Sequence, residues 1–421
     1  MKTKKIVVVG MGYVGFPLAC AIASKSDFEV VGIDSDKEKI SKIKNKKSPV
    51  EDLPSKMLKG IDIKATNSFE DLSDSDFIII CVPTPVYENK TPNLSFIINI
   101  SEIIAKHLHK GQVIILESTV NPGVCDDVIT PILEKNGLKA GIDFDLIHCP
   151  ERIDPGNKKW NIYNIPRNIG GTSKKGIQKA ISLYKTFLNA EIIELTSLKA
   201  TESTKIIENT FRDVNIAYVN ELAKIFDLMN IDIIEVIKAA STKPFAFMPH
   251  YPGCGVGGHC IPVDPYYLIQ KSKDLGFNSQ FMKMARLVND SMPRYTIERL
   301  ILGLNELGLP LKNTKIGILG LSYKANIGDL RESPSIEIIK ILKEFHADVL
   351  ICDPYVKNYE GLVDINYLLN KSTALILATA HHQFLKIKDW KKVKLIIDGR
   401  NCLNKDDIKN KNILYFGIGG K

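Results

Sequence analysis

A glycine-rich segment near the middle of the chain, GCGVGGHCIPVDP at residues 253–265, ends its run of small residues at Cys260. A cysteine thiolate acts as a nucleophile in an electropositive, partly exposed setting, and glycines leave room for a substrate to approach the sulfur. We therefore expect an exposed, freely bending loop that presents a catalytic thiol. A buried structural thiol is the alternative, because free cysteine is among the residues most often buried.

The same segment offers Cys254, His259 and Cys260 as candidate zinc ligands. A structural zinc site takes four ligands, and the spacing here lacks a second Cys/His pair. We predict no metal site.

The N-terminal run KIVVVGMGYVGFPLACAIA carries Gly10, Gly12 and Gly15 in G-x-G-x-x-G spacing, between a strand-like and a helical stretch. Such glycines permit a tight turn, close approach of the backbone to a pyrophosphate and close helix–strand packing, while the helix N-terminus attracts the negative charge. The next strand-like run, EVVGID, ends at Asp34, whose carboxylate suits a ribose 2′-hydroxyl and repels a 2′-phosphate. The pattern predicts NAD in preference to NADP; a glycine turn followed by a surface aspartate is the alternative.

A later segment, KIGILGLSYKANIGDLRESP, also begins with a strand-like run and a glycine, but it lacks the complete fingerprint. Lys324 and Arg331 in this segment are candidates for binding the phosphates of a nucleotide other than the dinucleotide. Two solvated basic side chains are the alternative.

Three regions of the chain differ in the pattern of their apolar residues. Up to about residue 196, β-branched runs (KIVVVG, EVVGID, DFIIICV, QVIILEST, FDLIHCP) alternate with helical stretches, which predicts a parallel α/β sheet. From about 199 to 300 the apolar spacing predicts helices, and from about 313 strand-like runs return (KIGILG, ADVLICD, TALILAT, KLIIDG). We predict an α/β protein with two Rossmann-like, doubly wound domains, residues 1–196 and 301–421, joined by a central helical domain, residues 197–300.

The start of the central region, KATESTKIIENTFRDVNIAYVNELAKIFDLM, predicts one long helix of about 30 residues. Its apolar residues lie on more than one face, and such a helix is usually covered by a partner on each side. We therefore expect a homodimer.

Composition narrows the class of protein. The chain has 421 residues, enough for two or three domains, and 44% hydrophobic with 25% charged residues is typical of a globular protein. The net charge of +8 comes from lysines spread along the chain, and no nucleic-acid-binding motif accompanies them. We expect no nucleic-acid partner.

Targeting and membrane signals are missing from the sequence. No apolar signal-peptide region precedes the first strand-like run, and no window approaches the roughly 18 consecutive apolar residues of a membrane span. The eight cysteines are scattered, which favours thiols over a disulfide framework. These features predict a soluble cytoplasmic protein without a membrane partner.

Several separated motifs together resemble the nucleotide-sugar 6-dehydrogenases, the family of UDP-glucose dehydrogenase and of its relatives acting on UDP-N-acetylhexosamines. The motifs run in order along nearly the whole chain: GMGYVG, VPTP (82–85), STVNPG (118–123), CPERIDPGN (149–157), KIIENTFRDVNIAYVNE (205–221), PGCGVGGHCIPVDP (252–265), LGLSYKANIGDLRESP (319–334) and DGRN (398–401). The resemblance implies two successive hydride transfers to NAD from C6 of a UDP-sugar.

The resemblance also implies roles for catalytic residues. Cys260 matches a thiol that forms a thiohemiacetal and then a thioester, and Lys205 and Asn209 match residues that stabilise charge on oxygen. Asp264 matches an aspartate near the water and the lysine, although Asp-Pro here also fits a helix N-cap. Glu151 matches an acid/base for hydrolysis, and Thr119 a residue that holds water.

The matched motifs imply two further sets of binding residues. The cofactor set is Gly10, Gly12, Gly15, Tyr13, Val14, Asp34, Thr84 and Arg331. The substrate set is Arg152, Arg212, His250, Gly257, Lys324 and Arg400.

The sugar is indicated by departures from the UDP-glucose enzymes. Many of those enzymes have a second acidic residue where this chain has Pro155, and asparagines where it has His250 and Tyr251. PERIDPGN, IPRNIGG and GGHCIPVDPYYL resemble the branch acting on UDP-N-acetylhexosamines, whose acetamido group needs a differently shaped pocket. We expect UDP-N-acetylglucosamine; UDP-N-acetylmannosamine, UDP-N-acetylgalactosamine and UDP-glucose remain open, as do a two-electron dehydrogenase and a nucleotide-sugar-binding sensor without turnover.

Overall fold

The computed structural model describes residues 4–50, 53–154, 157 and 159–420. The chain forms two compact units, unit 1 with Met1–Glu208 and Tyr266–Phe277, and unit 2 with Asn209–Pro265 and Asn278–Lys421. Pro155 lies outside the described residues. Within the described ranges, no helix combines the length and the apolar character needed to cross a membrane.

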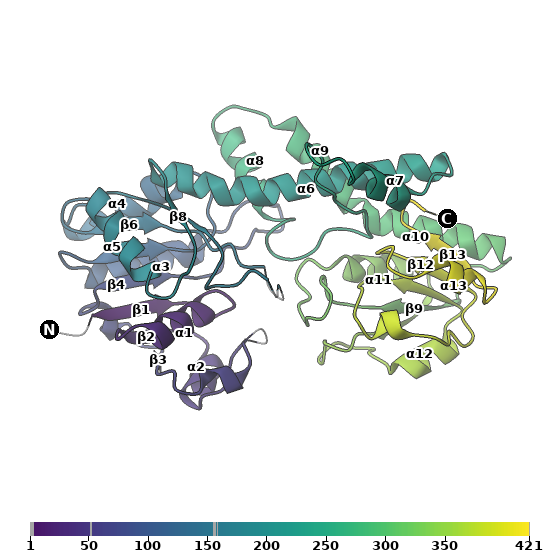
Figure 1. Ribbon diagram of the computed structural model, residues 1–421, viewed down its shortest axis with the longest axis horizontal. Coiled ribbons are helices and arrows are strands. Elements are labelled where there is room, and N and C mark those ends of the chain that lie inside the picture. Colours follow the sequence, from purple (N-terminus) through teal and green to yellow (C-terminus); the bar gives the residue numbers. More distant parts are fainter. Residues whose placement is uncertain (1–3, 51–52, 155–156, 158, 421) are drawn as a thin grey trace. The chain divides into compact units, whose positions relative to one another are not determined.

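Unit 1 is built on a sheet of eight strands among its described residues, in the order β3-β2-β1-β4-β5-β6-β7-β8 (Figure 1). The first six follow the strand order of dinucleotide-binding sheets. The strands are β1 (Lys5–Val9), β2 (Glu29–Ile33), β3 (Lys64–Thr66), β4 (Phe77–Ile80), β5 (Val113–Leu116), β6 (Asp145–His148), β7 (Arg167–Gly171) and β8 (Ile192–Glu194).

The prediction of an all-parallel sheet needs one correction, because β6 and β7 pair antiparallel. Sequence analysis found the five apolar strands but missed β3, β7 and β8. Strands β3 and β8 have only three residues each, and β7 ends in two glycines, so none of them carries a strong β-branched run.

Helices cover both faces of this sheet because successive strand residues point to opposite faces and both are apolar. Ile6 and Val8 of β1 pack with α1, α2 and α5, while Val7 and Val9 pack with α3 and α4. The helices are α1 (Gly15–Lys25), α2 (Lys37–Lys44), α3 (Ser95–His107), α4 (Thr130–Leu133) and α5 (Lys174–Tyr184). Short turns of helix are η1 (Ser55–Leu58), η2 (Glu70–Leu72), η3 (Cys125–Ile129) and η4 (Glu134–Asn136).

The predicted long helix is confirmed as α6 (Leu198–Leu228), which spans 31 residues and continues from unit 1 into unit 2. Further helices follow it, as the lack of strand-like runs predicted. They are α7 (Ile233–Ala240), α8 (Asp264–Asp274), α9 (Gln280–Asp290) and α10 (Met292–Glu306).

Unit 2 contains a second parallel sheet, whose five strands among the described residues follow the order β10-β9-β11-β12-β13. This is the other common doubly wound order, that of flavodoxin-like sheets. The strands are β9 (Lys315–Leu319), β10 (Asp348–Cys352), β11 (Ala374–Leu377), β12 (Leu395–Asp398) and β13 (Leu414–Gly417). The first four were predicted; β13 was missed.

Helices also cover both faces of the second sheet. Helices α10 and α11 (Pro334–Glu344) pack on one face, and α12 (Ile365–Lys371), η5 (Phe384–Lys386) and α13 (Lys405–Lys409) pack on the other. The predicted fold class, two doubly wound α/β sheets with a long central helix, is therefore confirmed.

Candidate active site

The G-x-G-x-x-G turn has the geometry that its glycines predict. Gly10 has a φ of +95°, and a Cβ there would lie 2.6 Å from the carbonyl oxygen of Cys81. A Cβ on Gly15 would lie 2.0 Å from the carbonyl oxygen of Gly10, so only glycine allows α1 to start this close to β1. A Cβ on Gly12 would meet nothing within 4 Å, which leaves open space for a pyrophosphate at the backbone.

Asp34 follows β2 and faces this turn. Its Oδ2 accepts a hydrogen bond from the backbone N–H of Met11 at 2.8 Å and from Lys39 Nζ at 3.3 Å, and its Oδ1 accepts from the N–H of Asp36 at 2.9 Å. A carboxylate has about four lone-pair positions, so Oδ1 keeps capacity for a ribose hydroxyl. The turn and Asp34 together fit the adenosine and pyrophosphate parts of NAD.

The remaining cofactor candidates of unit 1 lie around the same edge of the sheet. Tyr13 is exposed in the turn and Val14 immediately precedes α1. Thr84 lies in the segment after β4, where its carbonyl oxygen accepts a hydrogen bond from the hydroxyl of Tyr267 at 2.6 Å. This bond fixes the VPTP segment against α8 within unit 1.

The cysteine segment is not the freely bending, exposed loop that we predicted. Cys254 is fully buried, and its N–H donates to the carbonyl oxygen of Gly399 at 3.1 Å. The N–H of Gly258 donates to the carbonyl oxygen of Arg331 at 2.9 Å. A Cβ on Gly257 would lie 2.5 Å from the Cβ of Tyr323. The glycines are therefore required for close packing against neighbouring loops of unit 2, in addition to positive φ at Gly255 and Gly258.

Cys260 is half-buried at the end of this packed segment. Its carbonyl oxygen accepts the N–H groups of Val263 at 3.0 Å and Asp264 at 2.8 Å, so a tight turn leads from the thiol into α8. Helix α8 begins at Asp264 itself, one residue before the start that the predicted N-cap implied. The Asp264 carboxylate, 3% exposed, accepts a hydrogen bond from Asn209 Nδ2 at 2.5 Å.

Lys205 lies one helical turn before Asn209 on α6, as predicted. Lys205 is half-buried, and its charge helps to lower the pKa of Glu151 in unit 1. Unit 2 therefore brings together Cys260, Asn209 and Asp264, while unit 1 brings together Lys205 and Glu151.

Glu151 is held by a dense set of donors. Its Oε1 accepts the backbone N–H groups of Arg152 at 2.5 Å and Ile153 at 2.6 Å, and its Oε2 accepts Arg167 Nη2 at 2.8 Å. Burial raises the pKa of Glu151, but the charge of Arg167, these backbone bonds and the charge of Lys205 outweigh burial and leave the pKa below its usual value. At neutral pH the group is a carboxylate, which suits a base and not an acid.

Arg167 and Glu117, which sequence analysis missed, form a buried network behind Glu151. Arg167 is 1% exposed, and its Nη1 donates to Glu117 Oε1 at 2.9 Å, an atom that also accepts the hydroxyl of Tyr184 at 2.5 Å. Burial and the charge of Glu151 raise the pKa of Glu117 to about 7, although Arg167 opposes this shift. The only sequence signal was a charged residue opening the short strand β7.

Thr119 lies in the segment after β5, which is held from two sides. The preceding residue, Ser118, donates its hydroxyl to the carbonyl oxygen of Val82 at 2.7 Å. Glu202 of α6, fully buried, accepts the N–H groups of Gly123 at 2.6 Å and Cys125 at 2.7 Å. Glu202 was also missed, because its partners are far away in sequence.

The substrate candidates on unit 1 and α6 differ in their settings. The guanidinium of Arg152 is bound within unit 1, to Glu208 at 2.7 Å and to the carbonyl oxygen of Pro166 at 2.9 Å. Arg212 is exposed on α6. His250 is half-buried, and its ring packs edge-on against Phe211 with centroids 5.9 Å apart.

The basic candidates of unit 2 lie in loops that follow its strands. Lys324 is half-buried in the loop after β9, and Arg400 follows β12, where its Nε donates to the carbonyl oxygen of Ala378 at 2.8 Å. A Cβ on Gly253 would lie 2.9 Å from Arg400 Nη1, which places this arginine beside the cysteine segment. Arg331 is half-exposed, and Asp329 accepts its guanidinium at 2.5 Å.

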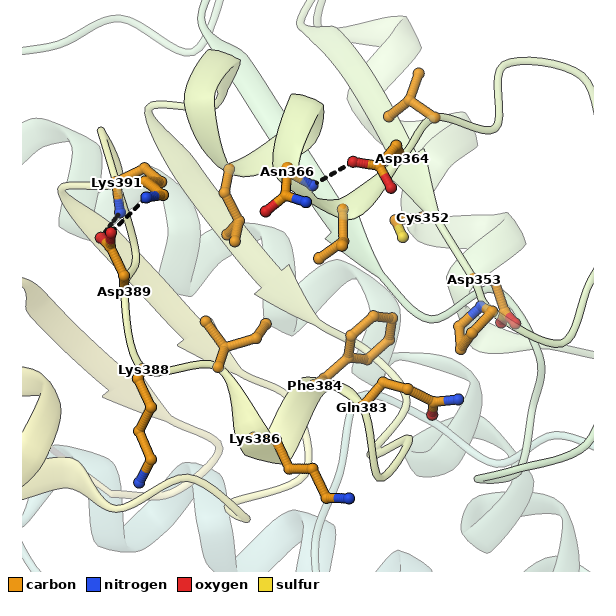
Figure 2. A pocket seen from close by; sticks show the side chains of 15 residues that line it. Cys352, Asp353, Asp364, Asn366, Gln383, Phe384, Lys386, Lys388, Asp389 and Lys391 are labelled. Carbon is orange, nitrogen blue, oxygen red and sulfur yellow. Dashed lines mark hydrogen bonds and ion pairs between the residues drawn. The ribbon is translucent and has the colours of Figure 1, made fainter.

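Unit 2 has an open hollow of about 560 Å³. Figure 2 shows the side chains that line it. Its lining comes from the end of β10, from α12 and from residues 383–391, and it includes Cys352, Asp353 and Phe384 together with Lys386, Lys388 and Lys391. None of the residues predicted from the sequence lines it. Within the described ranges, no group of three His, Cys, Asp or Glu side chains is arranged to hold a metal ion.

Comparison with known proteins gives one family for all three parts of the chain. Sequence models of the UDP-glucose/GDP-mannose dehydrogenase family match the NAD binding domain at residues 4–188, the central domain at 199–291 and the UDP binding domain at 317–405.

Individual relatives match almost end to end. The UDP-N-acetyl-D-glucosamine 6-dehydrogenase of Pseudomonas aeruginosa is 36% identical, with 91% of this chain and 92% of the relative covered. The UDP-N-acetyl-D-mannosamine dehydrogenase of Pyrococcus horikoshii is 35% identical, with 99% of each chain covered. A solved structure of the UDP-D-ManNAc dehydrogenase from Pyrococcus horikoshii superimposes with a TM-score of 0.92 over 99% of each chain at 33% identity.

Proposed function

The chain belongs to the UDP-glucose/GDP-mannose dehydrogenase family and is an NAD-dependent UDP-sugar dehydrogenase, and we propose that it oxidises C6 of a UDP-N-acetylhexosamine to the carboxylate. UDP-N-acetylglucosamine is our first choice of substrate. The observation that carries the proposal is Cys260, half-buried beside the hydrogen-bonded pair of Asn209 and Asp264. A thiol is not needed for a single alcohol oxidation, but it is needed to hold an aldehyde between two oxidations.

The proposed reaction removes four electrons from one carbon. The primary alcohol, two NAD⁺ and one water give the carboxylate, two NADH and three protons. Bound NAD supplies the acceptor for each hydride. Lys205 and Asn209, one turn apart on α6, stabilise negative charge on the C6 oxygen as it develops.

Cys260 has the central covalent role in this scheme. The thiolate adds to the C6 aldehyde to give a thiohemiacetal, and loss of the second hydride converts that adduct into a thioester. Water then attacks the thioester carbonyl, and the thiolate leaves. Glu151, anionic at neutral pH, accepts the proton of the attacking water directly or through Thr119.

The basic residues of unit 2 are proposed to bind the UDP part. Lys324 and Arg400 lie in the loops after β9 and β12, at the carboxyl ends of parallel strands, where doubly wound sheets bind ligands. Arg331 is proposed to act on the cofactor phosphates. The guanidinium of Arg152 is paired with Glu208. This pairing favours a structural role for Arg152 beside Glu151 over direct contact with the substrate.

The choice of sugar rests on relatives whose names differ. One relative acts on the N-acetylglucosamine form and another on the N-acetylmannosamine form, at nearly equal identity. We therefore keep UDP-N-acetylmannosamine, UDP-N-acetylgalactosamine and UDP-glucose as alternatives. A two-electron dehydrogenase and a sensor without turnover are less favoured, because neither needs Cys260, Lys205 and Asn209 together.

We also propose a homodimer formed through α6. Large apolar side chains are exposed along this helix at near-heptad spacing: Ile207, Phe211, Tyr218, Ile225 and Leu228. A stripe of this kind is normally covered by another helix. Light scattering is expected to give twice the chain mass of 47.0 kDa. A cytoplasmic location stays a prediction.

The test of the proposed function is the NADH formed at completion from limiting UDP-N-acetylglucosamine, with the product mass recorded in the same sample. Two NADH per sugar and a carboxylate are expected. One NADH per sugar favours the two-electron dehydrogenase. No NADH with any of the four UDP-sugars, together with tight binding in calorimetry, supports the sensor.

A further inference from the structure

A chain of buried polar side chains in unit 2 ends on the backbone of the cysteine segment. Asp213 and Asn220 come from α6, and Arg286 and Asn289 come from α9. Asp213 and Asn220 are fully buried, and Asn289 and Arg286 are 1% and 4% exposed. This series of hydrogen-bonded side chains ends at Gly253, the first residue of the glycine-rich segment. Burying this many polar groups is costly unless each one is hydrogen-bonded.

The hydrogen bonds of this chain run in one direction only. The N–H of Gly253 donates to Asn220 Oδ1 at 3.0 Å, and Asn220 Nδ2 donates to Asn289 Oδ1 at 2.8 Å. Asn289 Nδ2 then donates to Asp213 Oδ1 at 2.8 Å and to the Asp213 carbonyl oxygen at 3.0 Å. A backbone N–H can only donate, so it fixes the orientation of both amides in turn, and the chain must end on an acceptor.

That acceptor is the carboxylate of Asp213, which also accepts Arg286 Nη1 at 2.5 Å. Burial raises the pKa of Asp213, and Arg286 and Asn289 offset this effect only in part. A raised pKa means that keeping Asp213 ionised costs folding free energy at neutral pH.

The same face of α6 holds the other end of the cysteine segment. Asn209 bonds to Asp264, and Asn220 bonds to Gly253. Asn209 and Asn220 are separated by eleven residues, about three complete turns of helix, so they lie on one stripe about 16 Å apart along the axis. Cys260 is thus carried on a stretch of chain whose two ends are anchored to one rigid helix.

We propose that Asn220, oriented by Asn289 and Asp213, is a positioning residue for Cys260 that fixes the entry of the glycine-rich segment, as Asn209 fixes its exit. The proposal deepens, and rests on, the proposed role of Cys260 as the group that retains the aldehyde. A small shift of a nucleophile costs on the order of 100-fold in rate, so an anchored segment has a direct chemical benefit.

The experiment compares Asn220→Ala with the wild-type enzyme by its aldehyde leakage. Loss of the anchor lets the aldehyde escape before it is captured, so semicarbazide traps it and the NADH formed per sugar consumed falls from two towards one. We expect kcat to fall by about tenfold or more with the KM for the UDP-sugar changed by less than about threefold. If Asn220 has only a structural role, its loss lowers the amount of active enzyme but leaves the NADH formed per sugar consumed at two.

Matched variants complete the comparison. Asn215→Ala changes another amide of α6, one whose Nδ2 donates to the Phe211 carbonyl oxygen of the same helix, and is expected to behave as wild type. Asn289→Ala keeps the Asn220–Gly253 bond but removes the partner that orients the Asn220 amide. We therefore expect the same defect in weaker form. If Asn220→Ala does not fold, Asn289→Ala decides the question, and a ratio of two with wild-type kcat in that variant overturns the proposal.

A second readout needs neither substrate nor NAD. Alkylation of Cys260 by iodoacetamide, followed by mass spectrometry of its peptide, is expected to be at least about threefold faster in Asn220→Ala than in Asn215→Ala, because the half-buried thiol becomes more accessible. Equal rates overturn the proposal. An altered rate in a protein that oxidises none of the four UDP-sugars supports the anchoring and contradicts the proposed function alone.

Discussion

The two sheets begin in the same way and then diverge. Gly10 after β1 and Gly320 after β9 have nearly the same φ, +95° and +94°. In unit 1, α1 starts at Gly15, after a short turn with open space over Gly12. In unit 2, α11 starts only at Pro334, so a long loop, residues 320–333, joins β9 to the helix in place of the short turn.

The acidic residue at the end of the second strand shows the same divergence. Asp34 in unit 1 accepts three hydrogen bonds and keeps capacity for a ligand. Asp353 in unit 2 accepts two backbone N–H groups at each oxygen: those of Leu321 and Ser322 at Oδ2 and those of Tyr355 and Val356 at Oδ1. One strand-end carboxylate is thus available to a cofactor, and the other is consumed in holding a loop.

His381 completes the loop-holding arrangement in unit 2. The N–H of Asn326 donates to His381 Nδ1 at 2.8 Å, so Nε2 carries the proton and donates to Asp353 Oδ2 at 3.0 Å. Lys324, a proposed substrate contact, lies in the loop that these bonds hold. The acidic residue after the second strand can therefore contact a ligand itself, as proposed for Asp34, or hold a loop that carries a ligand-binding residue, as proposed for Asp353.

The largest effect is expected from Asp353→Ala. Four backbone N–H groups and His381 lose their acceptor inside the protein, so the free energy of unfolding should fall by about 3 kcal/mol or more. Urea denaturation followed by circular dichroism measures it. Asp364→Ala, which removes only the N-cap of α12, is the control and should cost about 1 kcal/mol. Equal losses would contradict the loop-holding role.

The second effect is on the affinity for NAD, which should depend on the turn after β1 in unit 1 and not on the turn after β9 in unit 2. Gly12→Ala places a methyl group where the structure has open space, so stability should change by less than about 1 kcal/mol. The methyl group occupies the place expected for the pyrophosphate, and the Kd for NAD should rise by about tenfold or more. Calorimetry tests this, with Ser322→Ala in the turn of unit 2 expected to leave NAD affinity unchanged.

The third effect is an opposite pH dependence of buried carboxylates in the two units. Glu117 has its pKa raised from 4.5 to about 7, so its contribution to stability falls as the pH rises from about 4.5 to 7. Asp353 has a lowered pKa despite its burial, because His381 and backbone N–H groups bind its carboxylate; its contribution is lost as the pH falls below about 4.

Glu117→Gln tests the unit 1 half of that contrast. Between pH 5 and pH 8 the variant should gain about 2 kcal/mol of unfolding free energy relative to wild type, because it has no proton to lose. Denaturant unfolding at both pH values measures this difference. A difference between variant and wild type that does not change with pH would show that Glu117 is ionised throughout.

The smallest effect is expected from Arg331→Ala. Its ion pair with Asp329 is partly exposed, so the free energy of unfolding should change by less than about 0.5 kcal/mol. The Kd for NAD should rise by about threefold if Arg331 acts on the cofactor phosphates. Lys340→Ala, an exposed charge on α11, is the control for a general charge effect, and an equal rise in Kd there would exclude a specific role for Arg331.

Sequence analysis succeeded where the signal is local. The glycine turn and the long helix α6 are set by spacing within one or two elements, so motif and periodicity were sufficient to place them. The apolar strands were found for the same reason. The roles of Asp34, Lys205 and Asn209 stay predictions, those of the α6 pair from the family resemblance. Strands β3, β7 and β8 were missed because their pairing comes from the sheet and not from their own residues.

The missed residues share long sequence separations from their partners. Arg167 meets Glu117 across 50 residues, Glu202 meets Gly123 across 79, and Asn289 meets Asn220 across 69. A single sequence carries no sign that such pairs meet. The glycines of the cysteine segment were recognised in the sequence, but the reason for them was not. They allow close packing against neighbouring loops of unit 2, and those loops are distant in sequence.

The directional amide chain has a consequence for redesign of this enzyme. Asparagine and aspartate have almost the same shape, so a method that scores only packing treats them as interchangeable at Asn220 and Asn289. Aspartate at either position would replace an amide donor with an acceptor, and two oxygens would then face each other without a proton between them. The two positions therefore require a fixed order of donors and acceptors, which the volume of the side chains does not reveal.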